Sequence, residues 1–186
     1  MRFPFNTTKA VEVGCRFLEL DGGTINVMKL IKLIYLLDRR SIETRGIPVV
    51  GGDYLSMRNG PVTSEVLDLI NAGRLGDGES CEWEKYISDR QSHEVSLEQT
   101  PRYENLAPAE MRLIDEIHGK HGKKDQWQLR DWCHEHCSEW TKLEDGAAPI
   151  FVQDIAQALG MTMEDTKEIE LNARESHLIT HFLVKG

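Results

Sequence analysis

The fold of this chain is decided by residues 29–39, Lys-Leu-Ile-Lys-Leu-Ile-Tyr-Leu-Leu-Asp-Arg. On a helical wheel a broad apolar arc predicts a helix in the centre of the core. Within this stretch the arc is formed by Leu30, Ile31, Ile34, Tyr35 and Leu37. The helix begins after Asn26, a favourable N-cap residue, and continues to Arg45. Gly46 follows as a residue that commonly ends a helix in the left-handed conformation.

Four basic residues share one side of this predicted helix: Lys29, Lys32, Arg39 and Arg40. The stripe is unusual because the whole chain has 22 basic and 31 acidic residues and a net charge of −9. We interpret this basic stripe as a candidate docking face for an acidic partner. The alternative is a solvated face that neutralises neighbouring aspartate and glutamate side chains, and the pattern leaves both interpretations open.

Asp38 lies in the middle of the apolar arc, where a carboxylate is costly unless a cation or several N–H groups satisfy it. We therefore predict a structural carboxylate that pairs with a buried donor. The alternative is a catalytic acid whose pKa is raised by burial.

Composition excludes several classes of protein. The longest uncharged apolar run, residues 33–37, is far shorter than the roughly 20 residues that cross a membrane. The N-terminus has no apolar segment behind a basic start, so we expect no secretory signal. Four scattered cysteines in 186 residues do not make a disulfide framework, which favours a reducing, cytoplasmic location. The net charge of −9 argues against non-specific nucleic-acid binding.

The rest of the chain predicts more helices around a small β element. Gly60 and Pro61 predict a sharp junction between a strand and a helix, with Pro61 at the first helical position. Residues 74–105 are interpreted as a loop and β-hairpin insertion. Together these patterns predict an α+β fold, a predominantly helical single domain over residues 1–186 with a small antiparallel β element. The predicted helices are 7–20, 62–72, one from 108, 125–137, 150–159 and a C-terminal helix within 162–186; the predicted strands are 53–58, 83–88 and 93–97.

Three ordered blocks of sequence resemble one known family. The first is the Lys-Leu-Ile-Lys helix with its Asp, the second is Gly-Pro-Val at residues 60–62, and the third is a His followed by a Trp. Over about residues 9–160 the chain is similar to the Panacea domain, also called the SocA-like antitoxin domain, although Cys133 stands where that family usually has Thr. The residues that carry the resemblance are Lys29, Leu33, Tyr35, Asp38, Gly60, Pro61, Val62, His134 and Trp140.

The resemblance implies an antitoxin that neutralises a protein toxin by direct binding, or an adaptor that delivers the toxin to a cytoplasmic AAA+ protease. Related domains also occur in phage-associated proteins. The expected contact surface is either the basic stripe or the apolar C-terminal end, with Leu178 and Phe182 as its candidates. We find no nucleophile with a base at readable spacing, so we expect no enzymatic activity, and we expect no cofactor.

Two alternatives come from other motifs. Cys133, His136 and Cys137 share one helix face, as the ligands of a structural zinc site would, although a fourth ligand is not evident. Residues 154–174 have the spacing of a helix-turn-helix unit, which would make the protein a DNA-binding regulator. The second helix of that unit is rich in glutamate and aspartate, and carboxylates disfavour a position beside DNA phosphates.

Overall fold

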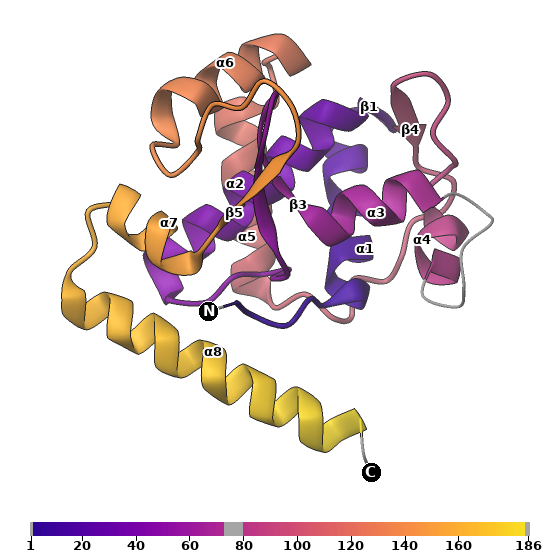
Figure 1. Cartoon of the computed structure of the whole chain (residues 1–186). Coiled ribbons are helices and arrows are strands. Elements are labelled where there is room, and N and C mark those ends of the chain that lie inside the picture. Colours follow the sequence, from indigo (N-terminus) through magenta and orange to yellow (C-terminus); the bar gives the residue numbers. More distant parts are fainter. Residues whose placement is uncertain (1, 73–79, 185–186) are drawn as a thin grey trace.

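The computed structural model describes residues 2–72 and 80–184, except for the side chains of residues 80–81 and 181–184. Helices dominate the described chain, and small antiparallel sheets accompany them (Figure 1), which confirms the predicted α+β class. The elements in chain order are α1 (Thr7–Leu20), β1 (Thr24–Asn26), α2 (Val27–Arg45), β2 (Tyr54–Met57), β3 (Gly60–Thr63), α3 (Ser64–Ala72), α4 (Ser80–Tyr86), β4 (Glu94–Ser96), α5 (Pro108–His121), α6 (Gln126–His136), β5 (Ala147–Ile150), α7 (Val152–Ala158) and α8 (Met163–Val184).

Helix α2 is the central element, as predicted. It packs against α1, α5, α6 and β3 (Figure 1), and Leu30 and Leu33 on its apolar arc are fully buried. The Asn26 side chain caps its start by accepting a hydrogen bond from the Met28 amide at 2.9 Å. Gly46 ends it with a φ of 67°. Both boundaries therefore agree with the local signals in the sequence.

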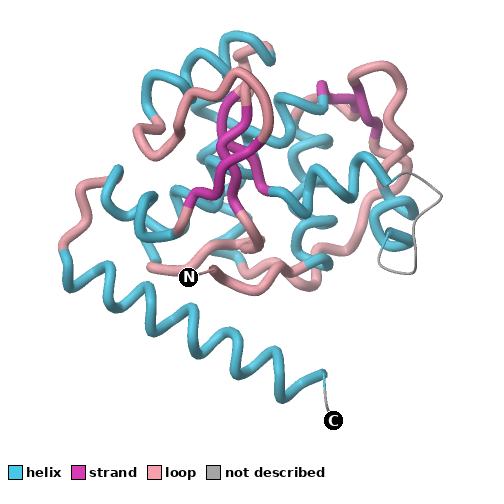
Figure 2. Tube along the Cα trace, in the orientation of Figure 1, coloured by secondary structure: helices cyan, strands magenta, loops and turns pink. Residues whose placement is uncertain are grey.

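The main sheet has three antiparallel strands in the order β3-β2-β5, drawn in magenta in Figure 2. The prediction that Pro61 begins a helix was wrong, because Gly60–Thr63 pairs with β2 and helix α3 begins only at Ser64. Strand β3 lies at the edge of the sheet, where proline is tolerated because no further strand requires a hydrogen bond from its missing N–H. Gly60 has a φ of 105° directly after the turn between the strands, a conformation that glycine tolerates best.

The hairpin predicted for residues 83–88 and 93–97 is only partly present. Helix α4 occupies most of the first segment, because buried Trp83 packs against α1, where its ring lies 3.0 Å from the position that a Cβ on Gly14 would take. Strand β4 pairs instead with β1, which the sequence analysis did not predict, and this pairing joins buried Ile25 to buried Val95. Residues 73–79 lie outside the described residues.

The C-terminal part adds β5, which was not predicted, and the predicted helices α7 and α8. Thr162 and Asp165 cap the start of α8 through reciprocal hydrogen bonds of 2.9 and 3.1 Å. Helix α8 lies along one side of the molecule (Figure 1) and buries Ile169 and Ala173. No helix in the described chain is both long enough and apolar enough to cross a membrane.

Candidate functional site

Asp38 is a structural carboxylate at the centre of the fold. It is fully buried, and its Oδ1 accepts hydrogen bonds from the amides of Val49 and Val50, both at 2.8 Å. Its Oδ2 accepts from the Gly51 amide at 2.9 Å and from the Tyr54 hydroxyl at 2.8 Å. Burial raises the pKa of Asp38 to about 6, while the four hydrogen bonds act in the opposite direction. The carboxylate thus fastens α2 to the segment that enters β2.

A second buried carboxylate fastens α2 to the segment after α6. The Glu139 side chain, which has no exposed surface, accepts hydrogen bonds at 2.7 Å from the Tyr35 hydroxyl and from Nε of Arg39. Arg39 also donates to the carbonyl oxygen of His136 at 3.3 Å. Two residues from one face of α2 therefore hold the C-terminal end of α6.

Two further cations of the basic stripe, Lys29 and Arg40, are also paired within the chain. The buried Lys29 ammonium lies 2.7 Å from Asp21 and donates to the Gly122 carbonyl at 2.8 Å. Arg40 contacts Glu43 at 2.7 Å and Glu116 at 3.0 Å. The stripe is consequently a series of internal ion pairs at Lys29, Arg39 and Arg40, in line with the neutralising interpretation.

Lys32 differs from its neighbours on the stripe. The residue is only 1% exposed, and its ammonium donates one hydrogen bond, to the carbonyl oxygen of Pro61 at 3.0 Å. No carboxylate lies within ion-pair distance of it among the described residues. Burial lowers the pKa of Lys32 to about 8, and the nearby Arg130 charge acts in the same direction. A Cβ on Gly60 would lie 3.0 Å from the Lys32 ammonium, so glycine is also needed here for space.

His134 and Trp140 meet Lys32 at the same strand turn. Their rings stack with centroids 3.9 Å apart and an angle of 6°, and the Trp140 indole donates to the Met57 carbonyl at 2.9 Å. The His134 Nε2 atom is buried, and it has no hydrogen-bond partner in the described part of the chain. Burial and the Lys32 charge lower the pKa of His134, which favours its neutral form. The structure therefore brings residues from three distant blocks of sequence together around Gly60.

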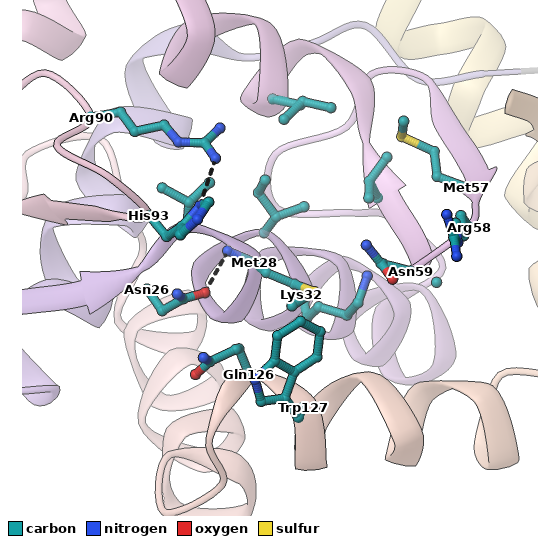
Figure 3. A pocket seen from close by; sticks show the side chains of 15 residues that line it. Asn26, Met28, Lys32, Met57, Arg58, Asn59, Arg90, His93, Gln126 and Trp127 are labelled. Carbon is teal, nitrogen blue, oxygen red and sulfur yellow. Dashed lines mark hydrogen bonds between the residues drawn. The ribbon is translucent and has the colours of Figure 1, made fainter. Parts of the chain in front are cut away.

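An open pocket of about 380 Å³ lies beside this cluster (Figure 3). It is bordered by the start of α2, the turn between β2 and β3, residues 90–93 and the start of α6. Among its described lining residues there is no aspartate or glutamate. Its apolar lining is Val27, Met28, Ile31, Met57, Val62, Leu67 and Trp127, and its polar lining is Asn26, Lys32, Arg58, Asn59, Arg90, His93 and Gln126, with Gly60 at the turn.

Lys32 was predicted as a site residue from the sequence, but the other cationic and aromatic residues of this pocket were not. Arg58, Arg90 and Trp127 come from three separate segments. Arg58 lies within the stretch that ends in Gly-Pro-Val, but neither Arg90 nor Trp127 belongs to a motif. The half-exposed Trp127 indole lines the same pocket as Lys32 (Figure 3), and Arg90 contacts the His93 ring nitrogen at 3.1 Å. The exposure of Trp127 is the feature that marks it as a binding residue, and that exposure is known only from the tertiary structure.

The three candidate zinc ligands are not brought together. Cys133 and Cys137 are buried free thiols, but the His136 ring stacks on Trp132 at 4.3 Å, and its Nδ1 lies 2.9 Å from the Trp132 carbonyl oxygen. No group of three metal-binding side chains occurs in the described part of the chain. The shared helix face predicted from spacing is occupied instead by core packing.

Residues 154–174 form a pair of helices, α7 and α8, as the helix-turn-helix pattern predicted. The inner side of α8 is used for packing, since Ile169 and Ala173 are buried. Its first turn carries Glu164 and Asp165. These carboxylates would be repelled by DNA phosphates, which disfavours a DNA-binding role for α8.

The apolar C-terminal candidates lie further along α8. Leu178 is 57% exposed and Ile179 is 60% exposed. The side chain of Phe182 lies outside the described residues. The Leu178 side chain is therefore accessible to a partner, and its contact with a partner remains a prediction.

The comparison with known proteins gives one match. A family model described as "Antitoxin SocA-like, Panacea domain" matches residues 30–141, which is more than half of the chain. The matched region contains Asp38, the Gly60 turn, His134 and Trp140, and it includes most of the pocket lining. No curated protein and no solved structure matches the chain.

Proposed function

This chain belongs to the SocA-like Panacea domain family of antitoxin-type proteins, and we propose on that basis that it is the antitoxin of a toxin–antitoxin pair. In this proposal it neutralises a protein toxin by binding it directly in the cytoplasm. The observation that carries the proposal is the family match over residues 30–141. An open pocket formed mostly by the same matched region supports a role in binding.

We further propose that the protein acts by binding and not by catalysis. The buried carboxylates of Asp38 and Glu139 are each engaged by several donors from the protein itself. A carboxylate held in this way stabilises the fold and has little freedom to transfer a proton to a substrate. These contacts therefore support an interaction protein.

Two exposed features are available for the toxin. One is the pocket beside Lys32. The other is the outer side of α8, where Leu171, Leu178 and Ile179 are each more than half exposed. Exposed apolar side chains on one helix are typical of protein–protein contact surfaces. The negative net charge of −9 suits a cationic toxin surface, because complementary charge accelerates association.

The experiment is co-expression with the product of the adjacent gene. We expect the neighbour alone to stop growth, the pair to grow normally, and a tagged form of this chain to retain the toxin during purification. A chain carrying Asp38→Ala, which loses the four hydrogen bonds to the Asp38 carboxylate, serves as a destabilised control. If no neighbouring gene product is toxic, or if the toxic one does not bind, the antitoxin proposal is wrong.

A variant of the same function is delivery of the bound toxin to an AAA+ protease, with the chain as adaptor. Direct blocking predicts that the toxin stays intact and bound while growth is restored. Adaptor action predicts that the toxin half-life shortens only when this chain and the protease are both present. Measuring the toxin level after synthesis is stopped, with and without each protease gene, distinguishes the two.

A further inference from the structure

Lys32 is a buried cation with no anionic partner among the residues that the structure describes. The other three cations of the basic stripe, Lys29, Arg39 and Arg40, each have a carboxylate within 3.0 Å. The Lys32 ammonium has only the Pro61 carbonyl, so two of its three N–H donors have no acceptor among the described residues. Burying an unpaired charge is unfavourable, and an arriving carboxylate would remove much of that penalty.

The pocket beside Lys32 has the opposite electrostatic character to the rest of the protein. Lys32, Arg58 and Arg90 line it, and no described lining residue is acidic, although acidic residues outnumber basic ones by 31 to 22 in the whole chain. A concave site lined by one sign of charge concentrates ligands of the other sign. The site is therefore complementary to an anionic group.

The walls of the pocket also select for an apolar group beside the anion. Met28, Ile31 and Leu67 form part of its lining, and Trp127 stands at its edge with half of its surface exposed (Figure 3). A volume of about 380 Å³ lies within the range of roughly 300–1,000 Å³ that is typical of pockets for drug-sized ligands. Tryptophan and arginine are the residues most enriched among the strongest contacts of protein interfaces.

From these observations we propose that the pocket receives an extended segment of the toxin in which an acidic side chain is flanked by an apolar residue. The acidic group contacts the Lys32 ammonium and Arg58, and the apolar residue packs on Met28 and Trp127. This inference rests on the proposed antitoxin function. A bare inorganic anion fits the charge of the site but would leave its apolar walls in contact with water.

The test measures toxin affinity for three variants of the full chain. Arg58→Glu reverses a charge on an exposed residue, so folding is retained, and we expect about tenfold weaker binding. Lys32→Met removes the buried charge at similar length, and we expect at least a similar loss. Arg102→Glu is the matched control, because its side chain is 91% exposed and does not line the pocket; its affinity should equal that of the wild type.

The outcomes separate the two proposals. Binding by Arg58→Glu as tight as that of the wild type, with growth still rescued, overturns the pocket assignment and leaves the antitoxin function intact. A wild-type chain that neither binds nor rescues overturns both. A third outcome is that millimolar inorganic phosphate shifts the NMR resonance of the Trp127 indole N–H while Arg58→Glu leaves the toxin affinity unchanged. In that case the pocket is a small-anion site and the peptide proposal is wrong.

Discussion

The carboxylate of Asp38 on α2 accepts a hydrogen bond of 2.8 Å from the hydroxyl of Tyr54 on β2, and both residues are almost completely buried. The same carboxylate holds the amides of residues 49–51. One side chain therefore orients the central helix, the approach to the sheet and the first residue of β2. The position of the strand turn, and of the pocket beside it, depends on this connection.

Asp38→Asn should lower the free energy of unfolding by about 3 kcal/mol, because the amide nitrogen would face N–H and O–H donors that now bind an oxygen. Tyr54→Phe removes a single donor and should cost about 1 kcal/mol. Urea unfolding followed by circular dichroism measures both. Equal losses in the two variants would contradict the central role of Asp38.

Lys32→Met should stabilise the protein at neutral pH, on the order of 2 kcal/mol, because it removes a buried unpaired charge. Burial lowers the pKa of Lys32 from 10.5 to about 8 in the folded state. Between these values the unfolded chain binds more protons, so wild-type stability rises with pH relative to the variant.

The advantage of Lys32→Met should therefore be largest below pH 8 and should disappear as the pH rises through the ordinary value of 10.5. Thermal unfolding of both proteins at pH 7, 9 and 10.5 checks the trend. If Lys32→Met is more stable by a constant amount over this pH range, the two proteins differ in packing and not in the burial of a charge.

Gly60→Ala should destabilise the protein by about 2–3 kcal/mol. Its φ of 105° is strained for any other residue, and its Cβ would lie 3.0 Å from the Lys32 side chain. Gly22→Ala is the matched control, because Gly22 also has a positive φ, of 89°, but has no atom within 4 Å of the added Cβ. Gly22→Ala should therefore cost about 1 kcal/mol. Thermal unfolding of both variants measures how much stability each one loses. The additional loss in Gly60→Ala is the steric cost of placing a Cβ against the Lys32 side chain.

Leu178→Ser combined with Ile179→Ser should leave stability within about 0.5 kcal/mol of the wild type, because both side chains are more than half exposed. If this end of α8 contacts the toxin, the double variant should weaken toxin binding without any change in the unfolding curve. Ala173→Ser, at a buried position of the same helix, should show the reverse, with lower stability and unchanged affinity.

Much of the helical framework could be predicted from the sequence, because its signals are local. The N-cap at Asn26, the glycine at residue 46 and the capping pair Asp125 and Gln128 each act over a few residues. Strands β1 and β5 were missed, and the wrong predictions fall at β3 and α4. There, strand pairing to β2 and the packing of Trp83 on α1 outweigh the local preference of the segment.

The sequence by itself determined that α2 is the central helix and that Asp38 within it needs buried donors, since both follow from the period of a single helix. Only the tertiary structure decided which cations of the basic stripe are paired. Glu139 reaches Arg39 across 100 positions of the chain, and no comparable carboxylate reaches Lys32 among the described residues. The pocket was decided in the same way, because helix periodicity carries no information about which distant segments meet.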